Sequence, residues 1–147
     1  MPASALVTVG RLATATGTLL LAGGAAAWFA VTAQLRAEKI AVPDDADLLP
    51  GKPVQGPVTA YAEAAVIKRN AERASGGKTF ADISDALKTV ESGSDEERKL
   101  RGQSAALSTA ASLRTSLMTS VLAYGVSALV AGLGAFFLVC GRVLRRG

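Results

Sequence analysis

Two long stretches of the chain contain no charged residue, and arginine borders each of them on both sides. The first covers residues 12–35 and the second covers residues 115–141. The 27 residues of the second stretch would form a helix of roughly 40 Å, and a membrane hydrocarbon core is about 30 Å thick. Both stretches are therefore predicted to be transmembrane helices.

The segment between the stretches begins with turns and continues with helical periodicity. Four of the five prolines fall within residues 43–57, which predicts an extended, turn-rich connector. Pro57 suits the first position of a helix, and Ser75-Gly76-Gly77 would end that helix. Its predicted apolar stripe consists of Val58, Tyr61, Ala62, Ala65 and Val66.

Two capping boxes predict two further helix starts. Thr79 with Asp82 begins a short helix, and Ser94 with Glu97 begins a longer one after Ser92-Gly93. No proline follows up to Cys140, so we expect one helix to run from Asp95 into the second uncharged stretch. The short helix has the apolar stripe Phe80, Ile83, Leu87 and Val90. Positions expected to face the shorter helices are Leu100, Leu107, Ala110 and Leu113.

The distribution of charge predicts the topology. Of the net charge of +4, none belongs to residues 36–114, where twelve Lys/Arg balance all twelve Asp/Glu. The surplus consists of Arg11, Arg142, Arg145 and Arg146. Short basic segments near span ends remain in the cytoplasm. We therefore expect a multi-pass plasma-membrane protein with both termini cytoplasmic.

The predicted fold class is an all-α membrane protein with two antiparallel transmembrane helices joined by a mainly helical extracytoplasmic loop. Its predicted parts are a cytoplasmic N-terminus (1–11), span 1 (12–35), a helical loop (36–114), span 2 (115–141) and a basic tail (142–147). Residues 1–10 are expected to be disordered or to extend the first helix. Trp28 and Phe29 are expected at the outer interface.

Two alternatives remain open for the ends of the chain. The first stretch could be a cleaved signal peptide, with small residues around Val31-Thr32-Ala33, although it is longer than a typical signal core. The arginines of the tail could act as a stop-transfer anchor or could meet anionic lipid headgroups.

Small residues recur at four-residue spacing within the spans, which is a pattern of close helix packing. This spacing predicts a helix–helix seam, within the chain or with a partner, although an alanine-rich composition would produce the same pattern. The pairs are Ala13/Gly17, Gly23/Ala27, Ala128/Gly132 and Ala131/Ala135.

The chain offers little for catalysis or metal binding. It contains no histidine, and no charged residue lies inside either span. Asp44, Asp45 and Asp47 lack the glycine and glutamate of a calcium loop. Gly77-Lys78-Thr79 lacks the first glycine of a phosphate-binding loop. Cys140 is read as a small apolar residue. We therefore expect no catalytic residue, cofactor, metal or small-molecule substrate, and no nucleic-acid partner.

Four stretches of the chain are similar to an actinobacterial family of short two-span membrane proteins with no established activity. They are Gln34–Val42, Gly51–Ala62, Gly76–Ala81 and Leu113–Val126. This resemblance implies a membrane location and the two-span topology. Members of the family are sometimes labelled aromatic ring-opening dioxygenases. Such enzymes hold iron with histidine, so the label does not extend to this chain.

These features predict a non-enzymatic accessory or interaction subunit of a membrane or envelope complex, which contacts the bilayer and another membrane or envelope protein, or itself. Alternatives are a self-associating channel or pore former and an enzyme carried by the loop. Residues expected to contact a partner are Tyr61, Val66, Phe80, Ile83, Gly125, Ala128 and Gly132. Ordinary packing within the chain would account for the same residues.

Overall fold

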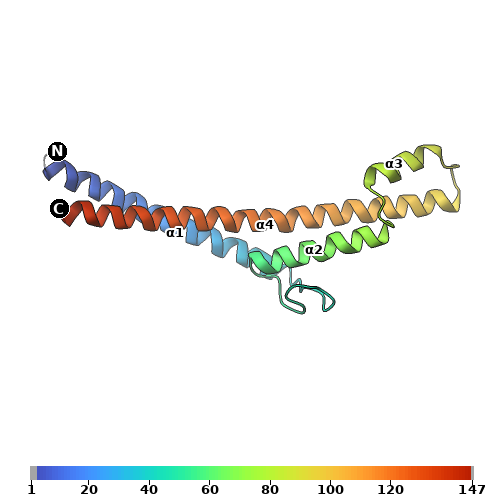
Figure 1. Cartoon of the computed structure of the whole chain (residues 1–147), viewed down its shortest axis with the longest axis horizontal. Coiled ribbons are helices and arrows are strands. Elements are labelled where there is room, and N and C mark those ends of the chain that lie inside the picture. Colours follow the sequence, from blue (N-terminus) through green and yellow to red (C-terminus); the bar gives the residue numbers. More distant parts are fainter. Residues whose placement is uncertain (1–2, 147) are drawn as a thin grey trace. The chain divides into compact units, whose positions relative to one another are not determined.

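The computed structural model describes residues 3–146, and within this range it contains four α-helices and no strand. Figure 1 shows their order along the chain. The all-helical prediction is confirmed, and the two uncharged stretches lie within the first and the last helix. The helices are α1 (Ala3–Ala37), α2 (Pro57–Ala74), α3 (Phe80–Thr89) and α4 (Asp95–Arg146).

By length and composition, α1 and α4 are long and apolar enough to cross a membrane. They contain 35 and 52 residues. Large apolar side chains on both helices are exposed, among them Leu19 at 75% and Leu122 at 68%. Such surfaces are typical of helices that meet lipid or another helix, because water does not favour extended apolar faces.

The chain divides into two compact units, and α4 takes part in both of them. We call residues up to Glu38 together with those from Val121 onward the two-helix unit. Residues Lys39–Ser120 are the loop unit. In the two-helix unit, the first turns of α1 lie beside the last turns of α4 (Figure 1), so this pair is antiparallel.

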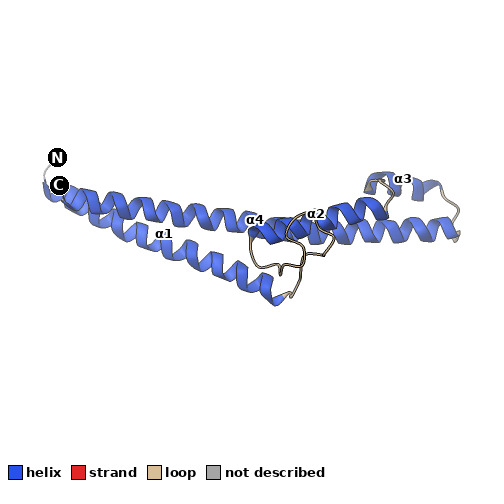
Figure 2. Ribbon diagram, turned by 60° about the horizontal axis from the view of Figure 1, so that its bottom comes forward, coloured by secondary structure: helices blue, strands red, loops and turns tan. Residues whose placement is uncertain are grey.

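The connector between α1 and α2, drawn in tan in Figure 2, is held by backbone pairing. Ala41 forms an isolated antiparallel bridge with Pro53. The N–H of Val42 donates to Lys52 O at 2.9 Å, and the N–H of Val54 donates to Ile40 O at 2.8 Å. Val42 and Val54 are each only 1% exposed. The proline-rich connector is therefore turn-rich, as predicted, and its two valines are buried.

The buried face of α2 differs from the predicted stripe. Ala62 and Val66 are buried as expected, but Val58 and Tyr61 are 56% and 53% exposed. Buried alanines at 60 and 64 take part in the core instead, because their small side chains allow close packing. Ile83 and Leu100 are buried, as predicted for the apolar faces of the loop. Phe80 and Leu113 were also predicted to pack there, but both are exposed.

Candidate functional site

Glycines spaced seven residues apart bring α1 and α4 together in the two-helix unit. Gly10, Gly17 and Gly24 of α1 face a matching series of small residues on α4, namely Gly141, Gly134 and Ser127. A side-chain carbon added at Gly17 would lie 2.7 Å from Gly134 O, and one added at Gly24 would lie 2.7 Å from Ser127 O. Only glycine allows backbones to approach so closely, which is how helices associate without a hydrophobic driving force.

The four-residue pairs that the sequence analysis proposed contribute to this seam only in part. Gly17 and Ala131 lie in the seam, but a carbon added at Gly23 or Gly132 would meet nothing within 4 Å. A period of seven keeps small residues on one face when two helices wind around each other in a left-handed sense. The spacing of seven was therefore the sequence signal for the packing of α1 against α4.

A polar and aromatic cluster lies further along the same helix pair. Tyr124 is 1% exposed, and its ring stands edge-on to Trp28 with centroids 4.6 Å apart and planes at 65°. The hydroxyl groups of Tyr124 and Thr32 lie 2.8 Å apart and are hydrogen-bonded. Sequence reasoning assigned no role to Tyr124. An available signal was that Tyr124 is the only tyrosine within the second uncharged stretch.

The predicted contact positions on α4 do not belong to the seam. Gly125, Ala128 and Gly132 are exposed, and a carbon added at either glycine would meet nothing within 4 Å. They form a second small-residue face on α4. In the loop unit, Tyr61 and Phe80 are also exposed, at 53% and 54%. Val66 and Ile83 are 4% and 0% exposed, so packing within the chain uses them.

Arg69 of α2 fixes the acidic part of the connector. Its guanidinium donates to Asp47 Oδ2 at 2.7 Å and to Asp45 O at 3.0 Å. Asp45 and Asp47 therefore both interact with Arg69. Among residues 3–146, no group of three or more His, Cys, Asp or Glu side chains is arranged to hold a metal ion.

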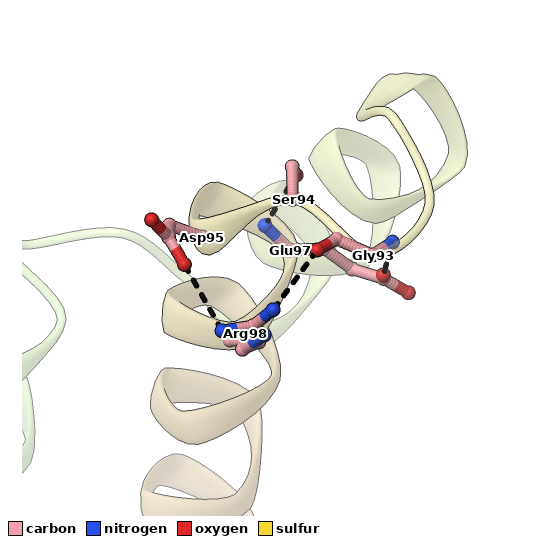
Figure 3. Close-up of polar contacts among 5 residues, drawn as sticks. All are labelled: Gly93, Ser94, Asp95, Glu97 and Arg98. Carbon is pink, nitrogen blue, oxygen red and sulfur yellow. Dashed lines mark hydrogen bonds and ion pairs between the residues drawn. The ribbon is translucent and has the colours of Figure 1, made fainter.

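Carboxylate side chains take part in the N-terminal caps of α3 and α4. Asp82 Oδ2 accepts hydrogen bonds from the Thr79 hydroxyl and backbone N–H, and these hold the pKa of Asp82 below its ordinary value. At α4, Glu97 accepts from the Gly93 N–H at 2.6 Å and its own N–H donates to Ser94 Oγ (Figure 3). The Gly93 N–H, and then the Arg101 side chain, lower the pKa of Glu97. The two predicted helix starts are confirmed.

Glu63 is the buried carboxylate of the loop unit. It is 9% exposed, and its Oε2 has no hydrogen-bond partner within the described part of the chain. Burial disfavours the charged form and therefore raises the pKa of Glu63 above its ordinary value. Such a group destabilises the loop unit when it is ionised.

The four flanking arginines, Arg11, Arg142, Arg145 and Arg146, are all exposed. Arg11 lies near the start of α1, and the other three lie in the last turns of α4. Both sets of flanking charges therefore belong to the same end of the antiparallel pair. Comparisons with protein-family models, with curated proteins and with solved structures found no match. The resemblance described above therefore remains a prediction.

Proposed function

We propose that this chain is a non-enzymatic, two-span membrane protein that serves as an interaction subunit of a membrane or envelope complex. The observation that carries the proposal is the combination of the glycine seam with the apolar exposure of the same helices. The seam uses one face of each helix, and side chains such as Leu19 and Phe29 remain 75% and 71% exposed. Lipid is the solvent that such faces favour.

The topology proposed is that both termini lie in the cytoplasm and the loop unit lies outside. Its support is the antiparallel helix pair, which brings Arg11 to the same end as Arg142, Arg145 and Arg146. A test uses a Cys140→Ala background with single cysteines at exposed Ser92 or at Arg146, probed in intact cells with a membrane-impermeant maleimide. We expect labelling at position 92 alone. Labelling at position 146 would exclude this topology.

The proposed contact surface of the loop unit contains two of the four residues that the sequence suggested. Tyr61 and Phe80 are exposed aromatic residues, and such residues are enriched where proteins meet. Photo-crosslinking amino acids at these two positions in living cells should give a discrete higher-mass product. The same reagent at the exposed polar positions Glu72 and Lys99 provides the control. Recovery of monomer alone from all four positions would contradict a partner role.

A second candidate function is self-association through the exposed small-residue face of α4. Gly125 and Gly132 have open space beside them, so another helix could approach closely there. A channel also needs a polar lining, whereas Ser120 and Ser127 donate back to carbonyls of their own helix. Mass measurement in detergent, together with ion flux in liposomes, separates a simple dimer from a pore.

A further inference from the structure

Three arginines in the last turns of α4 surround one hollow. Arg142, Arg145 and Arg146 line a hollow of about 280 Å³ that is open to the surroundings. Their spacing of three and four residues places them on one side of the helix. Pockets for small ligands begin at about 300 Å³, so the hollow matches a headgroup and not a large ligand.

No carboxylate side chain of the same region balances these charges. All twelve Asp and Glu residues lie between Glu38 and Glu97 in the sequence. None of the ion pairs described among residues 3–146 includes an arginine of the hollow. Guanidinium groups recognise phosphate through paired hydrogen bonds, so an anion from outside the chain is the matching ligand.

Packing against α1 positions one of the three arginines. Gly10 is buried, and a side-chain carbon there would lie 2.7 Å from Cγ of Arg145 and 3.0 Å from Gly141 O. The aliphatic stem of Arg145 therefore lies against the glycine backbone, which leaves its charged end free to face the ligand. Packing against α1 therefore holds the stem of one of the three arginines that line the hollow.

An exposed apolar ladder leads up to the arginines. Phe136, Val139 and Val143 are 61%, 58% and 65% exposed, and their spacing of three and four residues places them along one face. Arg146, three residues after Val143, continues this face by one more turn, and Arg142 lies three residues after Val139. A phosphate with attached acyl chains fits both parts, whereas free phosphate would use only the arginines.

We infer that Arg142, Arg145 and Arg146 form a binding site for the headgroup of an anionic phospholipid whose acyl chains lie along Phe136, Val139 and Val143. This inference rests on the membrane location proposed above. It adds a specific lipid ligand to that location. It also distinguishes a built site from the general attraction of basic residues to a negative membrane surface, which is worth about 1 kcal/mol per residue.

The test measures lipid retention by native mass spectrometry of the full chain, titrated with phosphatidylglycerol or with phosphatidylcholine of the same acyl chains. We expect wild-type protein to retain phosphatidylglycerol preferentially. Replacing the three arginines by glutamine should weaken its binding by at least roughly 100-fold, because the charge of each cation alone contributes about 1 kcal/mol. The triple variant Lys52→Gln, Arg73→Gln and Lys99→Gln removes the same charge from exposed loop-unit positions and should bind like wild type.

Two further variants separate the site from simple charge attraction. Replacing the three arginines by lysine keeps the charge but removes the planar guanidinium groups that donate paired hydrogen bonds to phosphate. This variant should bind phosphatidylglycerol several-fold more weakly. Val143→Asn keeps all arginines and should also weaken it. Wild-type affinity in both variants would overturn the inference, as would full displacement of the lipid by millimolar inorganic phosphate. Unchanged Trp28 fluorescence verifies that the helix pair has formed in each variant.

Failure of this inference can be told apart from failure of the proposed function. Flotation with vesicles and resistance to carbonate extraction report insertion regardless of the lipid headgroup. A protein that inserts but retains both lipids equally overturns the lipid site alone. A protein that remains in the aqueous fraction with either lipid overturns both proposals.

Discussion

The two units of this chain use different means to hold helices together. In the two-helix unit, α1 and α4 meet at glycines spaced seven residues apart, and the cross-helix hydrogen bond described there joins Thr32 and Tyr124. In the loop unit, helix starts are closed by carboxylates and Arg69 bridges α2 to the connector. If α1 and α4 cross a membrane as proposed, the difference follows from the two surroundings. Close backbone packing holds helices together where lipid removes the hydrophobic driving force, and caps bond the free backbone groups at the helix ends of the loop unit.

The comparison also shows where each unit can be broken. The two-helix unit tolerates large side chains everywhere except on one face, since its other surfaces are exposed. The loop unit has a small core of alanines and single large residues, such as Ile83 at 0% exposure. It therefore depends more on polar contacts, which are sensitive to pH.

The largest expected effect is that of Gly134→Val in the seam. Side-chain carbons there would lie 2.7 Å from Gly17 O and 2.9 Å from Leu21 Cα. Overpacking of this kind costs about 1–3 kcal/mol, and contact with backbone favours the upper end. SDS titration in mixed micelles, followed by fluorescence of Trp28, measures the loss, since Trp28 is the only tryptophan and contacts Tyr124.

The matched control for this variant is Gly132→Val, two residues away on the same helix. An added carbon at position 132 meets nothing within 4 Å, so its titration should match that of wild type. Equal destabilisation by both variants would show that a larger side chain anywhere on this part of α4, and not the seam, causes the loss, since valine has a higher helix propensity than glycine.

A second prediction concerns pH and Glu63. Because burial raises the pKa of Glu63 in the folded loop unit, stability is greater at low pH and falls as pH rises through that raised pKa. Glu63→Gln removes this fall and should stabilise the loop unit at pH 7 by about 1 kcal/mol, the scale of one buried unsatisfied group. Hydrogen exchange of α2 amides, corrected for intrinsic rates, measures the change, with exposed Glu91→Gln as the control.

Asp82 and Glu97 should act in the opposite direction. Their pKa values are lowered in the folded state, so their contribution is present at neutral pH and is lost as pH falls through the lowered values. Amides in the first turns of α3 and α4 should therefore lose protection from exchange in acid. Over the same range Glu63 becomes neutral, so its destabilisation of the loop unit disappears. Uniform loss of protection in α2, α3 and α4 at acid pH would contradict this separation.

A smaller effect is expected from Thr32→Val, which removes the hydrogen bond to Tyr124 within the two-helix unit. Interhelical hydrogen bonds in membranes contribute about 0.6 kcal/mol on average. The same SDS titration reports it through Trp28. Thr18→Val provides the control, because the Thr18 hydroxyl donates to Thr14 O in its own helix and lies exposed. A difference between the two variants measures the cross-helix bond.

The smallest effect is expected from Arg69→Met in the loop unit. Its partner Asp47 has a side chain that is 93% exposed, and ion pairs of that kind contribute about 0.5 kcal/mol. Exchange should increase at the paired amides of Val42 and Val54, which close the connector. Arg73→Met changes an exposed arginine of the same helix and should leave those amides protected. Exchange that is equal in both variants would show that Arg69 does not fix the connector.

Much of the secondary structure followed from the sequence alone. Pro57, the Ser75–Gly77 break and the capping residues Thr79 and Ser94 each marked a helix boundary that the structure reproduces. These signals are local, because a cap or a breaker acts on backbone groups within one turn. The two uncharged stretches likewise predicted the two long helices directly.

The faces of those helices could be recognised only in part. The sequence offered several small-residue spacings, and the seven-residue set became visible only when α1 and α4 were placed antiparallel. Likewise, Val66 and Tyr61 share a periodic pattern, yet packing buries the first and leaves the second exposed. Periodicity shows that a stripe exists, but which neighbour covers it depends on residues distant in the chain.

The sequence by itself determined which segments are helical, their polarity and the boundaries at Pro57, Ser75–Gly77, Thr79 and Ser94, because these depend on hydrophobic runs, prolines and caps that act locally. The tertiary structure alone decided that Gly10, Gly17 and Gly24 meet Gly141, Gly134 and Ser127, and that Tyr124 is buried against Trp28. It also placed the Arg145 stem on Gly10 and left Glu63 buried without a partner for its Oε2 among the described residues. Close packing between distant segments fixes such pairs, and no local pattern encodes them.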